Sequence, residues 1–213
     1  MSDTYWRNPP PGRRVSSAEL GDFVAIDDSN DFTYYETEQH LLRAFEYVSE
    51  AVCILDRKGT TYRLTLDANR HLMLAPPDGP VEFSWLRQAW LDAQNSHRAT
   101  HRLRRFFPLT VAELLADLFE IVPLEQETPA AAWTLDLNGQ TFSSSRLSDI
   151  DHQLAHEKVL DRIRVTDPFG HFYKPARHHS RWHVPGTREP VVYIEIPSPA
   201  TSPSSPPPKS SRT

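Results

Sequence analysis

The segment "AVCILDRKGTTYRLTLDANRHLMLA", residues 51–75, decides the predicted fold. It contains three short apolar-rich runs, AVCILD, TTYRLTL and HLMLA, which are separated by RKG and DANR. Short β-rich runs with turn residues between them are typical of neighbouring strands joined by tight turns. The segment therefore predicts an antiparallel meander.

A helix is expected just before the meander, in TYYETEQHLLRAFEYVSE, residues 33–50. Thr33 and Glu36 have the spacing of a capping box, in which each end of the pair satisfies a backbone N–H of the first turn. Four apolar residues then follow at helical spacing on one face: Leu41, Phe45, Val48 and Val52.

Two further helices are expected after the meander. Pro80 is suited to the first turn of one of them, which has to end before Pro108. Its apolar side carries Leu86, Ala89, Trp90 and Ala93. Thr110 and Glu113 have capping-box spacing at the start of the next helix. That helix has the clearest apolar stripe in the chain, formed by Val111, Leu114, Leu115, Leu118 and Val122.

The C-terminal half adds a hairpin, a helix and a strand. WTLDLNGQTFSS, residues 133–144, is typical of a hairpin, because Asn138-Gly139 suits a type I′ turn. Ser148 with Asp151 predicts a cap for a helix over residues 149–163, and VVYIEI, residues 191–196, predicts a closing strand. Together these elements predict an α+β fold with a mostly antiparallel sheet and about four helices.

The length of 213 residues suits one domain. We expect a single globular α+β domain over residues 20–196. Residues 1–19 include three consecutive prolines, and residues 197–213 are almost entirely Pro, Ser and Thr. Neither segment carries enough apolar surface to offset its chain entropy, so both are predicted to be disordered.

Composition narrows the classes of function. The net charge is −5, opposite in sign to that of proteins that grip phosphate backbones, so a nucleic-acid partner is not expected. Cys53 is the one cysteine and lies in an apolar run, which predicts a small buried side chain. No run is long and apolar enough for a secretory signal or a membrane span, so we expect a cytoplasmic protein without a membrane partner.

Sequence motifs for common catalytic devices are absent. The chain contains no GxGxxG, GxxxxGK[ST], GxSxG or HExxH motif. Whether the protein is an enzyme stays open on sequence grounds, and the pattern favours a non-catalytic protein that needs no cofactor. The sequence does not determine the oligomeric state.

One histidine-rich stretch supports two hypotheses. FGHFYKPARHHSRWHVPG, residues 169–186, holds four of the ten histidines, and neutral imidazole is a good ligand for zinc, iron or nickel. The candidate metal ligands are His171, His178, His179 and His183. With one divalent metal such as zinc and an acidic residue as base, the alternative function is a metal-dependent hydrolase or nuclease. The pairs His97/His101 and His152/His156 are also spaced four residues apart, which suits either a shared metal or a solvated helix face.

The same stretch carries aromatic and arginine side chains, which are favoured at protein interfaces. The candidate interaction residues are Phe172, Tyr173, Arg181 and Trp182. They lead to the favoured hypothesis, a regulatory or accessory protein that acts through contact with another protein.

A basic stretch, HRATHRLRRFF, residues 97–107, supports a third hypothesis. Its arginines, Arg98, Arg102, Arg104 and Arg105, precede a turn and a helix, as in a helix-turn-helix DNA-binding regulator. The following helix carries Glu113, Asp117 and Glu120 and no basic residue, which suits a recognition helix poorly. An arginine face that pairs with acidic neighbours is the favoured explanation of the stretch, and the DNA-binding regulator is the weaker alternative.

Overall fold

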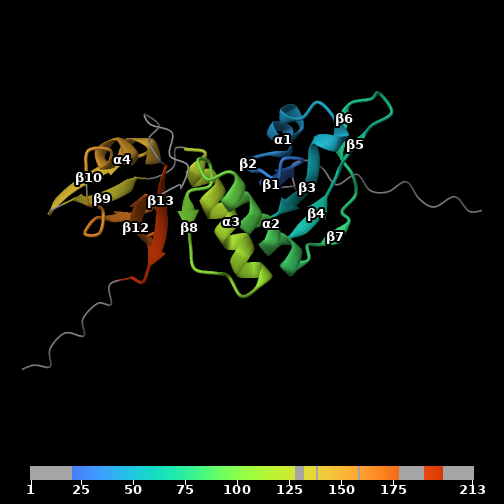
Figure 1. Cartoon of the computed structure of the whole chain (residues 1–213). Coiled ribbons are helices and arrows are strands. Elements are labelled where there is room, and N and C mark those ends of the chain that lie inside the picture. The colour runs from blue at the N-terminus through green and yellow to red at the C-terminus, as the bar shows by residue number, and fades with distance from the viewer. Residues whose placement is uncertain (1–20, 128–131, 138, 158, 178–189, 199–213) are drawn as a thin grey trace, which may run out of the picture. The chain divides into compact units, whose positions relative to one another are not determined.

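The computed structural model describes residues 21–127, 132–137, 139–157, 159–177 and 190–198. The chain divides into two compact units (Figure 1). Unit 1 consists of the residues up to His97 together with Pro108–Gln126, and unit 2 consists of Arg98–Phe107 and the residues from Glu127 onward. This division does not test whether residues 20–196 fold as one domain, so that prediction stays a prediction. Of the two segments predicted to be disordered, residues 1–19 lie wholly outside the described residues, and of residues 197–213 the structure describes only 197–198.

Unit 1 is built on an antiparallel sheet with the strand order β2-β1-β3-β4-β7. Its strands are β1 (Phe23–Asp27), β2 (Phe32–Tyr35), β3 (Ala51–Asp56), β4 (Thr60–Tyr62) and β7 (Gly79–Pro80). A separate antiparallel pair joins β5 (Leu64–Leu66) to β6 (Leu72–Leu74). The three predicted runs therefore do form strands, but TTYRLTL is split at Arg63 into β4 and β5.

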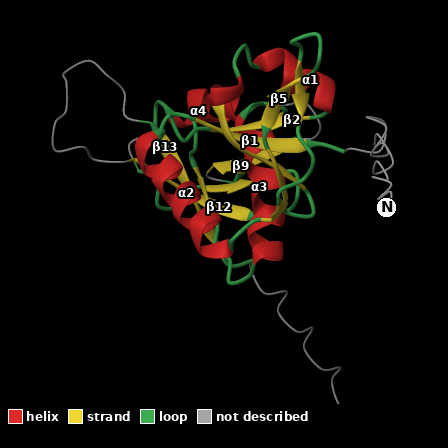
Figure 2. Cartoon of the chain, turned by 90° about the vertical axis from the view of Figure 1, so that its right-hand side faces the viewer, coloured by secondary structure: helices red, strands yellow, loops and turns green. Residues whose placement is uncertain are grey.

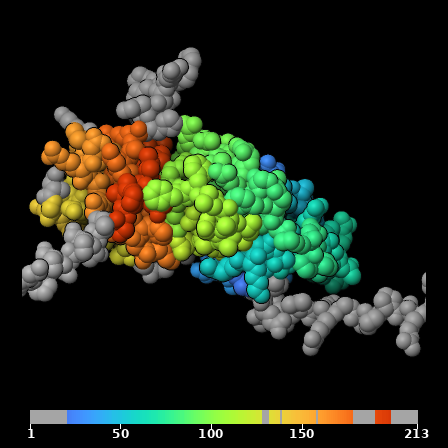
Figure 3. All heavy atoms as spheres, turned by 90° about the horizontal axis from the view of Figure 1, so that it is seen from below, coloured from blue at the N-terminus to red at the C-terminus, as the bar shows by residue number. Residues whose placement is uncertain are grey.

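The helices of unit 1 are α1 (Glu38–Ala44), α2 (Phe83–Ser96) and α3 (Val111–Glu125), with a short 3₁₀ turn at Val48–Glu50. They cover both faces of the sheet (Figure 2). On β2, Tyr34 packs edge-on against Phe119 of α3, while its neighbour Tyr35 packs against Phe45 just beyond α1. Consecutive residues of a strand point to opposite faces, so α1 and α3 lie on opposite sides of the sheet. Figure 3 shows both units as spheres.

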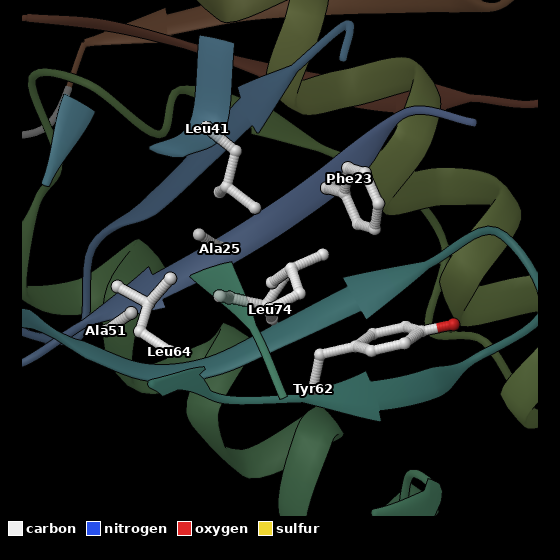
Figure 4. Close-up of a cluster of buried hydrophobic side chains, with 8 residues drawn as sticks. Phe23, Ala25, Leu41, Ala51, Tyr62, Leu64 and Leu74 are labelled. Carbon is white, nitrogen blue, oxygen red and sulfur yellow. The ribbon is translucent and has the colours of Figure 1, made fainter. Parts of the chain in front are cut away.

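Burial on both faces explains the composition of β1. Phe23, Val24, Ala25 and Ile26 are all fully buried, so no polar residue interrupts the run. Phe23 and Ala25 belong to a cluster under α1 and the β5–β6 pair (Figure 4). The other members of that cluster are Leu41, Ala51, Ile54, Tyr62, Leu64 and Leu74.

The helix predictions for unit 1 were partly wrong in their boundaries. Thr33 lies in β2, and α1 begins only at Glu38, where the Thr37 hydroxyl accepts a hydrogen bond from the His40 N–H. Pairing with β1 takes precedence over the Thr33 capping-box spacing. Pro80 pairs with Thr60 in β7, so α2 starts later than predicted, after Glu82.

The remaining predictions for α2 and α3 are confirmed. The residues expected on the apolar side of α2, Leu86, Ala89, Trp90 and Ala93, are buried. Thr110 caps α3 by accepting a hydrogen bond from the Glu113 N–H, and the Glu113 carboxylate completes the predicted capping box.

Unit 2 contains a sheet with the strand order β10-β9-β11-β12-β13-β8. Its strands are β8 (Leu103–Arg104), β9 (Trp133–Leu137), β10 (Gln140–Ser144), β11 (Arg164–Thr166), β12 (Phe172–Arg177) and β13 (Val191–Ile196). All neighbours are antiparallel except β8 and β13, which are parallel. The predicted hairpin and closing strand are confirmed as β9–β10 and β13, and both units together confirm the α+β class.

The helix of unit 2, α4 (Leu147–Leu154), differs from its prediction at both ends. It begins after Arg146, so Ser148 is not its cap, and the Ser148 N–H instead donates to the carboxylate of Glu127. It also ends nine residues earlier than expected. The guanidinium of Arg177, on β12, donates to the carbonyls of Leu154 and Glu157 and so satisfies the end of the helix.

Candidate functional site

The basic stretch forms the edge of the sheet of unit 2. Helix α2 ends at Ser96, and the chain then enters unit 2, where Leu103 is fully buried in β8. The Tyr193 N–H of β13 donates to the Arg102 carbonyl over 2.9 Å. After a turn at residues 98–100 the stretch is therefore extended around β8, and it does not form the first helix of a helix-turn-helix.

A buried ion pair fixes the end of this segment. The guanidinium of Arg105 donates to Asp167 over 3.0 Å and to the Tyr173 hydroxyl over 3.0 Å, and that hydroxyl donates to Asp167 over 2.9 Å. The Arg105 and Asp167 side chains are only 4% and 0% exposed. Burial raises the pKa of the Tyr173 hydroxyl, which therefore stays protonated and acts as a donor.

Asp167 also shapes the turn between β11 and β12. Its second carboxylate oxygen accepts hydrogen bonds from the backbone N–H groups of Phe169 and His171, each over 2.9 Å. One buried carboxylate thus binds Arg105 from one segment and closes a turn in another. The turn is positioned by a charge-assisted network rather than by local sequence alone.

Glu195, on β13, makes a second link between the same two segments. Its carboxylate accepts a hydrogen bond from the Phe106 N–H over 2.7 Å and lies 2.7 Å from the Nδ1 atom of His171. Residues 105–106 and residues 167–171 are therefore joined at two independent points.

A similar network lies further back along the basic stretch. Arg102 forms an ion pair with Asp151 of α4, and the Tyr193 hydroxyl donates to the same carboxylate over 2.6 Å. The Arg102 guanidinium lies 6.0 Å from the centre of the Tyr193 ring. Burial and the Asp151 charge raise the pKa of Tyr193. Arg102 and Arg105 thus stabilise the fold through aspartates.

Two further arginines, Arg98 and Arg104, were predicted to belong to a nucleic-acid surface. The guanidinium of Arg104 donates to the His101 carbonyl over 2.6 Å, and Arg98 lies in the turn after α2. The explanation that these arginines pair with neighbours within the protein fits Arg102 and Arg105 best.

Exposed phenyl rings lie on the two joined segments. Phe106 is 57% exposed and Phe169 is 56% exposed, and Phe107 next to Phe106 is also exposed. We name these three side chains the Phe106/Phe169 surface. Sequence reasoning missed it as a unit, although Phe169 begins the quoted histidine-rich stretch and both other rings end the basic stretch.

The residues predicted for protein contact have different positions. Tyr173 is fully buried and hydrogen-bonded, so the structure places it in the core and not on a contact surface. Phe172 is partly buried, with the Arg164 guanidinium 5.6 Å from its ring centre. Arg181 and Trp182 lie outside the described residues.

Of the four predicted metal ligands, the structure describes only His171. His171 lies beside Glu195, while His178, His179 and His183 lie outside the described residues. Among the residues with a described position, no group of three or more His, Cys, Asp or Glu side chains is arranged to hold a metal ion.

Neither of the two other histidine pairs lies within a single helix. His97 is the C-cap residue after α2 in unit 1, whereas His101 is buried in unit 2. His152 lies in α4, and His156 follows its C-terminal end. Cys53 is buried as expected, and burial raises the pKa of its thiol to about 11.

Within the described ranges, no helix is long and apolar enough to cross a membrane. Comparisons with models of protein families, with curated proteins and with solved structures gave no match.

Proposed function

We propose that this chain is a non-catalytic accessory or regulatory protein that binds another protein, and that the Phe106/Phe169 surface belongs to the contact. The observation that carries the proposal is the combination of exposure and anchoring. Two exposed phenyl rings are borne by segments that share a fully buried carboxylate, Asp167.

This combination suits protein recognition for two physical reasons. Aromatic side chains supply a large apolar area with few rotatable bonds, and they are favoured at the energetic centre of interfaces. Segments that are already ordered lose less conformational entropy on binding, so more of the contact energy contributes to affinity.

The polar groups around the surface support its backbone. Asp167 and Glu195 together accept hydrogen bonds from the N–H groups of Phe106, Phe169 and His171. These hydrogen bonds hold the backbone of both segments in a fixed position. Arg181 and Trp182, which follow in the connection from β12 to β13, remain predicted members of the same contact.

Affinity capture with the tagged full chain, from cells of the source organism, tests the proposal. We compare the wild type with the double variant Phe106→Ser/Phe169→Ser. The matched control is Leu66→Ser/Val159→Ser, which removes two other exposed apolar side chains. A third variant, Trp182→Ala, tests the predicted tryptophan.

We expect the wild type and the control to retain one partner at a constant ratio. With purified partner, we expect loss of the two phenyl rings, which together contribute about 2 kcal/mol or more of binding free energy, to raise the dissociation constant about thirtyfold or more. A partner that binds the double variant as tightly as the wild type, or the absence of any specific partner, contradicts the proposal.

The metal-dependent hydrolase or nuclease stays an alternative prediction, because three of its predicted ligands, His178, His179 and His183, lie outside the described residues. Metal analysis of tag-free full chain distinguishes it. Near-stoichiometric zinc that is lost in a His179→Ala/His183→Ala variant favours the enzyme, and it counts against a purely non-catalytic role.

A further inference from the structure

The edge strands of the two sheets differ in how well they are protected. An exposed edge offers unpaired backbone N–H and C=O groups, and proteins usually shield it with short strands, prolines, charges or covering groups. In unit 1, the edge strand β2 has its Tyr34 N–H bonded to the side chain of Gln126 over 2.9 Å. The opposite edge, β7, has two residues, of which one is Pro80.

In unit 2, one edge is protected and the other is open. The edge strand β8 has only two residues. The opposite edge, β10, has the sequence QTFSS over Gln140–Ser144, without a charge or a proline. Within the described part of the chain, β9 is the one strand that pairs with it.

The hairpin register identifies the backbone groups at the open edge. Gln140 pairs with Leu137 across a two-residue loop, and such a closing pair is a hydrogen-bonded one. Hydrogen-bonded and non-bonded pairs alternate along an antiparallel ladder. Gln140, Phe142 and Ser144 therefore direct their backbone groups toward β9, while those of Thr141 and Ser143 point outward.

The open edge is complementary to itself. When two copies of β10 are placed antiparallel with Phe142 at the centre, Thr141 of each copy lies opposite Ser143 of the other. Both residues have outward backbone groups, so these two pairs form the hydrogen-bonded pairs of the new ladder. The two Phe142 residues become a non-hydrogen-bonded pair, in which side chains approach most closely.

Burial and charge favour this occupant. Phe142 is only partly buried, although its partner Leu135 on β9 is fully buried, so one side of the Phe142 ring remains available. Because the strand has no charged side chain, a second copy brings no like charges into direct opposition.

We propose that β10 pairs with β10 of a second copy of this chain across a two-fold axis, which makes one continuous sheet from the two copies of unit 2. This site is the opposite edge of the sheet from β8, which Phe106 and Phe107 follow in the chain, and Phe169 lies in the turn between β11 and β12. Self-association through β10 is therefore independent of partner binding through that surface.

Sedimentation velocity of the full chain, at protein concentrations up to about 1 mM, tests the proposal in a range where small interfaces are detected. The variant Thr141→Lys/Ser143→Lys places a lysine opposite a lysine in both bonded pairs. The variant Thr141→Glu/Ser143→Glu does the same with glutamates. The control is Gln39→Lys/His40→Lys, which adds two lysines at exposed positions of α1.

We expect the wild type and the control to form dimers in a concentration-dependent manner. For each β10 variant alone, we expect the dissociation constant of the dimer to be about tenfold higher or more, because directly opposed like charges disfavour strand pairing. A mixture of the lysine and glutamate variants regains a one-to-one dimer, because opposite charges then face each other. Circular dichroism spectra confirm that each variant is folded.

A wild type that stays monomeric throughout the concentration range overturns the proposal. It is equally overturned if the lysine variant associates as strongly as the wild type, or if the mixture of folded variants does not associate. None of these results bears on capture of a different protein by the Phe106/Phe169 surface.

Discussion

Replacement of Asp167 by alanine is the most direct test of the buried network in unit 2. The substitution removes the Asp167 carboxylate that pairs with the Arg105 guanidinium, whose side chain is 4% exposed. It also removes the acceptor for the Tyr173 hydroxyl and for two backbone N–H groups of the β11–β12 turn.

The magnitude follows from the burial of both charges. Removal of one partner from a buried ion pair costs about 3–5 kcal/mol, because the other charge stays desolvated and uncompensated. Small domains have a total free energy of unfolding of about 5–15 kcal/mol. We therefore expect Asp167→Ala to remove a large share of the stability of unit 2.

Urea unfolding of the full chain, followed by circular dichroism, measures the loss. Asp161→Ala is the control, because Asp161 pairs with Lys174 at the surface and its side chain is 78% exposed. Exposed ion pairs contribute about 0–1 kcal/mol, so the control changes little. Hydrogen exchange then localises the effect, with faster exchange in β11–β13 than in β1 and β3.

A double variant isolates the role of the charge. Arg105→Met/Asp167→Ala lacks both members of the pair, so we expect it to be no less stable than Asp167→Ala alone. The reasoning is refuted if Asp167→Ala costs less than about 1 kcal/mol, the level of an exposed pair. It is also refuted if the losses caused by the two single substitutions simply add.

Four further predictions concern unit 1 and the hairpin of unit 2. Gly59→Ala is expected to destabilise more than Gly139→Ala in urea unfolding: both glycines have positive φ angles, but only at Gly59 does an added Cβ lie 2.7 Å from another side chain. Thr110→Ala is expected to cost about 1 kcal/mol by the same assay, because α3 loses its N-terminal cap. Cys53 is expected to react with a thiol reagent at pH 8 only after urea unfolds the chain, since burial raises its thiol pKa to about 11. Burial also raises the pKa of the Glu38 carboxyl, which disfavours its charged form in the folded protein. The stability that this group contributes is therefore fully present below its unfolded pKa of about 4.3 and is lost as the pH rises through the folded pKa. Urea unfolding across pH 3–8 should show that Glu38→Gln has a larger free energy of unfolding than the wild type only at the higher pH values.

Local patterns were sufficient for elements whose stabilising contacts are close in the sequence. The capping box at Thr110, the apolar stripe of α3 and the Asn138-Gly139 hairpin act over a few residues, so the sequence alone predicted them correctly. The same reasoning failed at Thr33, where pairing with β1 was not visible in the capping-box spacing. It also gave no prediction for β1, because a short apolar run has no periodicity that distinguishes a buried strand from a buried helix.

The candidate site shows the same division. The sequence indicated that residues 97–107 are rich in arginine and that residues 169–186 are rich in aromatic and histidine side chains, and it placed Cys53 in an apolar run. It did not show that Arg105 and Asp167 form a buried pair, or that Glu195 links Phe106 to His171.

What the sequence by itself determined, therefore, is the α+β class, the antiparallel strand runs and the helices whose periodicity and caps are local. The tertiary structure alone decided that β8 joins β13, that two arginines of a basic stretch are used inside the fold, and that Tyr173 is buried while Phe106 and Phe169 are exposed. The physical reason is the range of the interactions. Helix caps and tight turns depend on neighbours along the chain, whereas a buried charge and an edge strand are stable only with partners that folding brings from distant segments.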